Sequence, residues 1–127
     1  MTLDRDRIVE ICDNYCAAMS VGDPDATTAL FAPDASHEEP VGTPVRHGHE
    51  EIRGFFAQHK DIGFKLTRLG PATVVGNRAA FQVRVEVPTP EGSRFLAATD
   101  LITVSDDGLI AGIVVYPDAQ ADPDEAR

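Results

Sequence analysis

The chain has 127 residues, and 43% of them are hydrophobic, which is typical of one globular domain with a single core. Its formal net charge of -10 argues against binding to nucleic acids, because their phosphates would be repelled. No apolar run reaches the roughly 20 residues that span a bilayer. The charged N-terminus also lacks the apolar stretch of a signal peptide, so we expect a cytoplasmic protein that makes no membrane contact.

The spacing of apolar residues predicts three helices in the first half of the chain. The first extends from about Leu3 to Ser20. Asp23-Pro24 then supplies an N-cap acceptor and a proline at the first helical position, so a short second helix is expected, ending near residues 31–33. After an extended piece over residues 35–39 and a turn, a third helix is expected from His49 to Lys60.

After residue 63 the apolar period changes to two, which is typical of strands with one buried face. The first strand begins near residue 64, and a clearly alternating strand follows over residues 79–87. Two more strands are expected over residues 95–104 and 109–116, with turns between them.

Helices that precede an antiparallel sheet predict an α+β fold with the helices on one face of the sheet. We expect one domain over residues 1–117, since no linker or repeat divides the chain. The acidic residues 118–127 contain no core-forming side chains, so they are expected to form a disordered tail.

The cysteines and histidines show no pattern typical of a metal site, a cofactor site or a disulfide framework. Cys12 and Cys16 lie four residues apart on the first helix, as two small buried hydrophobic residues would. Of the four histidines, His37 is notable because it lies two residues before Glu39 and could share a site with it.

Asp100 lies in the middle of an otherwise apolar strand. Leu96, Ala98, Ile102 and Val104 share its face, because strand side chains alternate. If that face lines the core, desolvation raises the pKa of the carboxyl group and keeps it neutral near pH 7. A neutral acid can donate a hydrogen bond, which a carboxylate cannot.

Two further polar residues are candidates for a site, although each also has a plain structural explanation. Tyr15 lies on the apolar stripe of the first helix, where a phenol usually packs inward and finds a hydrogen-bond partner. Glu39 precedes the turn Pro40-Val41-Gly42, where a charged residue is normally solvated.

The segment from Gly22 to Gly42 resembles delta-5-3-ketosteroid isomerases of the nuclear-transport-factor-2-like superfamily. It contains a Gly-Asp start, the run Leu-Phe-Ala-Pro-Asp-Ala, and a Glu-Glu-Pro-Val-Gly turn where the family has Glu-Asp-Pro-x-Gly. Tyr15 and the strand of Asp100 extend the resemblance to about residues 8–116. It implies a cone-shaped α+β fold with three N-terminal helices packed on a curved, mostly antiparallel sheet, and a homodimer.

The resemblance also implies a cofactor-independent isomerase that moves a double bond of a small, apolar 3-ketosteroid from the delta-5 to the delta-4 position. A protonated aspartic acid is the known donor to the ketone oxygen in that family, and Asp100 takes this role by resemblance, with Tyr15 as the second donor. Glu39 takes the role of the general base. The substrate is expected to contact Phe31, Phe55, Phe56, Phe81, Val83 and Ala98.

The sequence departs from the family pattern at several positions. The base position holds glutamate instead of aspartate, and the adjacent Glu38 leaves the assignment of the base open by one residue. Phe31 and Phe56 stand where some members have tyrosine, and Pro117 replaces an aromatic residue of the pocket.

Two alternatives to the isomerase stay open. One is another enzyme on the same scaffold, a polyketide cyclase or an epoxide hydrolase. The hydrolase would need an arginine such as Arg84 to turn into the pocket and bond to Asp100. The other is a protein that binds lipophilic molecules without catalysis, since a fold does not fix a function.

Overall fold

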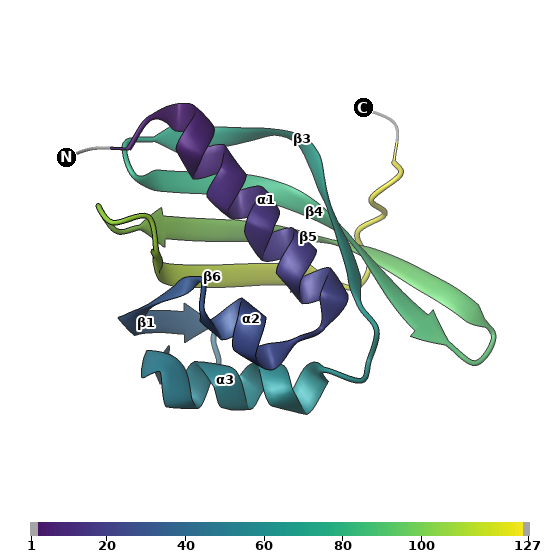
Figure 1. Cartoon of the computed structure of the whole chain (residues 1–127). Coiled ribbons are helices and arrows are strands. Elements are labelled where there is room, and N and C mark those ends of the chain that lie inside the picture. The colour runs from purple at the N-terminus through teal and green to yellow at the C-terminus, as the bar shows by residue number, and fades with distance from the viewer. Residues whose placement is uncertain (1–2, 126–127) are drawn as a thin grey trace.

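The computed structural model describes residues 3–125 and contains three helices and a six-stranded sheet (Figure 1). The α+β class predicted from the sequence is confirmed. In chain order the elements are α1 (Arg5–Val21), α2 (Pro24–Thr28), β1 (Phe31–Glu38), β2 (Arg46–His47), α3 (Gly48–His59), β3 (Lys65–Val75), β4 (Arg78–Thr89), β5 (Gly92–Val104) and β6 (Ile110–Asp118).

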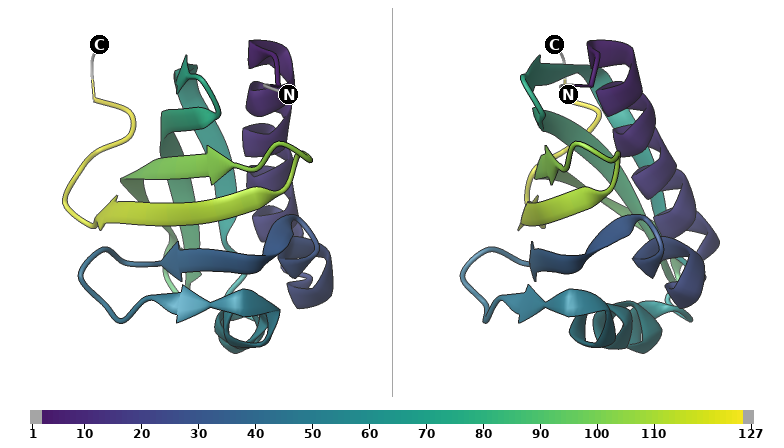
Figure 2. Two further views of the ribbon diagram at one scale, coloured as in Figure 1. Left: turned by 90° about the vertical axis from the view of Figure 1, so that its left-hand side faces the viewer. Right: turned by 60° about the vertical axis from the view of Figure 1, so that its left-hand side comes forward.

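The strands form one sheet in the order β2-β1-β6-β5-β4-β3. Neighbouring strands are antiparallel except β1 and β6, which are parallel and bring the first and last strands of the chain together. The turned views show α1 lying along one side of the sheet, with α3 beside β1 and β2 (Figure 2). The long β4–β5 hairpin extends beyond the helices (Figure 1).

The boundaries of α1 follow from its capping residues. The Asp4 carboxylate accepts a hydrogen bond from the backbone N–H of Arg7 at 2.8 Å, which satisfies a free donor of the first turn. Gly22 ends the helix in the left-handed conformation, with φ of 80°, and its N–H donates to the carbonyl of Ala18. The buried side of α1, which includes Ile8 and Tyr15, then faces the sheet.

The second helix is shorter than the sequence predicted. It ends at Thr28, and residues 31–33, expected to close the helix, already belong to β1. The reason lies at the other end of the chain, because the carbonyl of Leu30 accepts a hydrogen bond from the N–H of Ile110 in β6. Pairing with this distant strand takes up backbone groups that a longer helix would use.

The acidic C-terminal segment is described as far as Glu125, and residues 126–127 of the predicted tail lie outside the described residues. Pro123 is buried, and the Asp124 carboxylate forms an ion pair with Arg84 at 3.2 Å. The Arg84 guanidinium also lies over the Phe95 ring, 4.1 Å from its centroid. The segment therefore contacts the sheet through the Arg84 side chain of β4.

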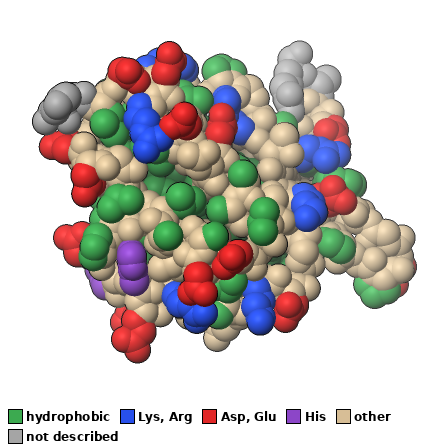
Figure 3. Space-filling model, in the orientation of Figure 1, with side chains coloured by type: hydrophobic (Ala, Val, Ile, Leu, Met, Phe, Trp, Pro, Cys, Tyr) green, Lys and Arg blue, Asp and Glu red, His purple; other side chains and the backbone are tan. Residues whose placement is uncertain are grey.

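Acidic side chains are spread among basic and hydrophobic ones over the face seen in Figure 3, without gathering into one acidic patch. No helix within residues 3–125 combines the length and the apolar character that crossing a membrane requires.

We predict that Gly22→Ala lowers the free energy of unfolding by about 1–2 kcal/mol, because a side chain disfavours the left-handed conformation. An added Cβ would also lie 3.1 Å from the carbonyl oxygen of Lys60. Gly54→Ala is the matched control: it lies within α3 with nothing near its added Cβ, so stability should rise by up to about 1 kcal/mol. Urea denaturation measures both changes, and equal effects would contradict this explanation.

Candidate active site

A cavity of about 350 Å³ lies between the C-terminal half of α1 and the sheet. Its wall is mostly aliphatic, and the strands contribute Leu66, Val83, Val85, Val87, Leu96 and Ala98. Four polar side chains also line it: Tyr15, Glu39, Arg94 and Asp100. The three candidate residues from separate parts of the sequence therefore share one apolar cavity.

Asp100 reaches the cavity because of its position on β5. Ala98 and Leu96 alternate onto the same face, and the neighbouring strands place Phe81 and Val115 opposite Asp100. Only 2% of Asp100 is exposed to solvent. Burial, followed by the negative charge of Glu39, raises the pKa of the Asp100 carboxyl group to about 8. This group is consequently a neutral hydrogen-bond donor at pH 7.

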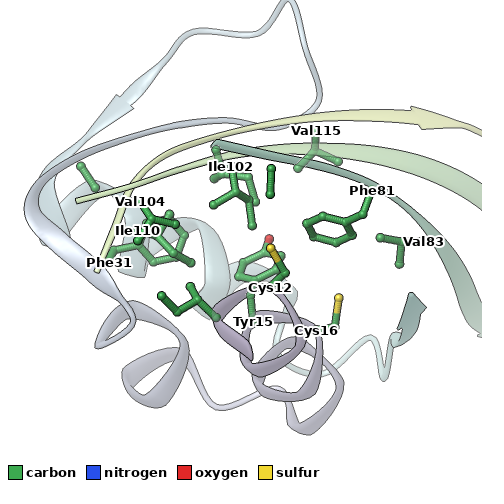
Figure 4. Close-up of a cluster of buried hydrophobic side chains, with 14 of the residues drawn as sticks. Cys12, Tyr15, Cys16, Phe31, Phe81, Val83, Ile102, Val104, Ile110 and Val115 are labelled. Atoms are coloured by element: carbon green, nitrogen blue, oxygen red, sulfur yellow. The ribbon is translucent and has the colours of Figure 1, made fainter. Parts of the chain in front are cut away.

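Tyr15 reaches the cavity from the opposite side. It lies on the buried face of α1 and is 1% exposed, and its ring points from the helix toward the sheet (Figure 4). Burial, together with the charges of Glu39 and Asp100, raises the pKa of the phenol well above its usual value. Tyr15 therefore stays a neutral donor over the whole ordinary pH range.

Glu39 follows the last residue of β1 and is the least buried of the three, with 20% of its side chain exposed. Its Oε1 lies 3.0 Å from Nε2 of His37. The turn after it is fixed to β6, because the N–H of Val41 donates to the carbonyl of Val115 at 2.8 Å. Val115 is also the residue opposite Asp100, so one strand positions both carboxyl groups.

Glu38 has a different environment from Glu39. Its Oε2 accepts a hydrogen bond from the N–H of Gly42 at 2.8 Å, and the residue does not line the cavity. The Glu38 side chain therefore closes the turn, while the Glu39 side chain faces the cavity.

The expected substrate contacts divide into two groups. Val83 and Ala98 line the cavity. Phe31, Phe55 and Phe56 do not, because α3 packs on β1 and turns these rings into the core around His37.

Phe81, which pairs with Asp100, lies in the cluster of buried hydrophobic side chains (Figure 4). It does not line the cavity. Aliphatic residues that were not predicted as substrate contacts line the cavity in place of these rings. Strand alternation places Val85 on the same face as Val83, and Leu96 on the same face as Ala98. It could therefore have predicted both residues as part of the cavity wall.

An epoxide hydrolase would need Arg84 to turn into the cavity and bond to Asp100, and Arg84 does neither. It pairs with Asp124 and stacks on Phe95, and it does not line the cavity with Asp100. Within residues 3–125 no cluster of three or more His, Cys, Asp or Glu side chains is arranged to hold a metal ion.

Comparison with known proteins places the chain in a family. Residues 12–113 match the family described as the SnoaL-like domain. The chain belongs to the SnoaL-like family. This SnoaL-like protein is 33% identical over 103 residues to a protein named Steroid Delta-isomerase from Nocardioides simplex, covering 80% of this chain and 82% of that protein. The predicted membership in the ketosteroid isomerase group of the nuclear-transport-factor-2-like superfamily is thereby confirmed.

A solved structure shares the fold of this SnoaL-like protein. It is the epoxide hydrolase/cyclase-like enzyme SalBIII, described as having a role in pyran ring formation in the polyether salinomycin. The TM-score is 0.81 and the identity is 25%, with 91% of this chain and 93% of that chain covered. These two similar proteins are thus named as a steroid isomerase and as an epoxide hydrolase/cyclase-like enzyme.

The raised pKa of Asp100 predicts how the stability of the SnoaL-like protein depends on pH. Between about pH 4 and pH 8 the folded chain holds a proton that the unfolded chain has lost, so stability falls as the pH rises through this window. Asp100→Asn removes this dependence. The variant should gain stability over the parent progressively from pH 5 to pH 8, by an amount on the order of 5 kcal/mol at most.

Urea denaturation of the parent and of Asp100→Asn at several pH values measures this gain. A difference between the two proteins that stays constant from pH 5 to pH 8 would show that Asp100 is already ionised in the folded state.

Proposed function

We propose that this protein is a steroid delta-isomerase that converts a delta-5-3-ketosteroid, or a similarly flat and apolar ketone, into its conjugated isomer. One observation carries the proposal: two neutral donors, Tyr15 and Asp100, share an apolar cavity with the carboxylate of Glu39. Two carboxyl groups in different environments can act as acid and base at the same pH.

The proposed reaction is a proton transfer within the substrate. The Glu39 carboxylate takes a proton from carbon 4, and the C–H electron pair forms a double bond to carbon 3. The carbonyl pair moves onto the oxygen, where hydrogen bonds from Tyr15 and Asp100 stabilise the dienolate in a site with little water. The dienolate then takes the proton back at carbon 6. The electron pair between carbons 5 and 6 forms the new C–H bond, and the pair between carbons 3 and 4 moves to lie between carbons 4 and 5. The oxygen pair restores the ketone, which is conjugated with the new double bond.

The size and composition of the cavity support a small apolar substrate. Its volume of about 350 Å³ lies within the range of small-molecule pockets. Arg94 lies six residues from Asp100 on the same face of β5, toward the hairpin. A hydrogen-bond acceptor at the far end of the substrate would meet this side chain. The homodimer implied by the resemblance stays a prediction.

The first test is turnover of 5-androstene-3,17-dione, followed by the ultraviolet absorbance of the conjugated enone. Glu39→Gln should reduce kcat by about 10²–10⁴-fold, because it removes the base. Asp100→Leu should reduce it by about 10²–10³-fold, because it removes one donor. Glu38→Gln, which keeps an acceptor for Gly42, is the control and should retain the parent's rate. Parent-like turnover by Glu39→Gln and Asp100→Leu would refute the proposal.

The second test is the pH dependence of kcat/KM. Activity requires protonated Asp100, whose pKa is raised to about 8, so kcat/KM should decrease as the pH rises through that value. Asp100→Asn keeps an N–H donor that does not ionise, so its profile should lack this alkaline decrease. An unchanged alkaline limb in the variant would assign the limb to another group.

A ring-closing cyclase is the second candidate, supported by the likeness to SalBIII. The same groups would serve: Asp100 would protonate an opening epoxide oxygen while Glu39 accepts the proton of the attacking hydroxyl. If the protein cyclises an epoxy-alcohol and does not turn over 5-androstene-3,17-dione, the cyclase is favoured over the isomerase. Tight binding of the steroid without turnover would select the non-catalytic binder.

A further inference from the structure

We propose that His37 is a positioning residue that holds the Glu39 carboxylate in the orientation needed for proton transfer. The inference rests on the proposed role of Glu39 as the base. Nε2 of His37 lies 3.0 Å from Oε1 of Glu39. Because an ionised carboxylate only accepts hydrogen bonds, this contact requires the proton of the imidazole to lie on Nε2.

The surroundings of His37 give the ring a fixed position. The residue is fully buried, with 0% exposure. Its ring centroid lies 4.7 Å from that of Phe55, 5.4 Å from that of Phe56 and 6.2 Å from that of Phe31. Rings packed on several sides leave the imidazole little freedom to rotate, so its N–H is preorganised toward Glu39. The phenylalanines expected to contact substrate would thus act indirectly, by fixing His37.

Folding alone does not explain a histidine at this position. Nδ1 of His37 is buried and has no hydrogen-bond partner among the residues that the structure describes. A buried polar atom without a partner destabilises the folded state, and an aliphatic side chain would fill the same apolar site without that penalty. Within residues 3–125 the side-chain hydrogen bond of this ring joins it to a cavity residue, which points to a functional reason for the histidine.

The inference also accounts for a glutamate at the base position. Compared with aspartate, glutamate has one more rotatable bond and samples more orientations at the cavity rim. A fixed hydrogen bond to one carboxylate oxygen restricts those orientations. Misplacement of a reacting group by a small distance strongly reduces a rate. Arg46, whose guanidinium lies over Phe55 and donates to the Glu39 carbonyl at 3.4 Å, holds the backbone of the same residue.

The test compares His37→Leu, which removes the donor, with His37→Gln, whose amide nitrogen can occupy the place of Nε2. With 5-androstene-3,17-dione, His37→Leu should lower kcat by about 10- to 100-fold while KM changes little, and His37→Gln should restore most of the loss. The urea midpoint of His37→Leu should equal or exceed that of the parent. His59→Leu is the control: His59 stacks on Phe55 but does not contact Glu39, so kcat should stay unchanged.

A double-mutant cycle separates positioning from packing. If His37 acts through the longer glutamate, His37→Leu should affect kcat much less in a Glu39→Asp background than in the parent. Equal effects in both backgrounds, or a kcat for His37→Leu equal to that of the parent, would overturn the inference.

The inference can fail independently of the proposed function. If the parent does not turn over the diketone, the proposed function fails, and nitrogen NMR of the imidazole still tests the contact. The Nε2–H signal of His37 should shift in Glu39→Gln and remain in place in Glu38→Gln. A signal that responds to neither substitution would show that His37 does not contact the Glu39 carboxylate.

Discussion

The proximity of two carboxyl groups with unequal access to water is the constraint on which the site depends. Asp100 is enclosed by the sheet and α1, while Glu39 stands at the rim with part of its side chain in solvent. Burial disfavours the charged form of Asp100, and the nearby negative charge of Glu39 disfavours it further, so Asp100 retains its proton. This inequality gives the cavity a donor at its depth and an acceptor at its edge without a metal-binding cluster among the described residues.

Local patterns in the sequence predicted the residues that alternation and helical periodicity place on one face. Tyr15 on the apolar stripe of α1 and Asp100 on the apolar face of β5 both reach the cavity. The parallel pairing of β1 with β6 was not predictable in this way, because no local pattern reports which distant strand becomes a neighbour. The early end of α2 follows from that long-range pairing, while Phe55 and Phe56 lie outside the cavity wall because α3 packs on β1.

Two buried polar groups of this site reduce the stability of the fold. Asp100 is held neutral in an apolar face, and His37 leaves Nδ1 without a partner. Apolar side chains of similar volume would pack at both positions with less penalty. Asp100 and His37 lie beside the same cavity, and the residues around them are otherwise well-packed aliphatic and aromatic side chains. Two destabilising polar residues at one cavity indicate selection for chemistry at the expense of stability.

The arrangement of β6 has a consequence for variation among proteins built on this plan. Val115 pairs with Asp100 on one side and accepts the N–H of Val41 on the other, so β6 fixes the separation of the backbone segments that carry the two carboxyl groups. That separation does not depend on the length of chain between Glu39 and Asp100. Insertions or deletions between α3 and β3, where Ile62 and Phe64 line the cavity, can reshape it for another substrate while the reacting pair keeps its span.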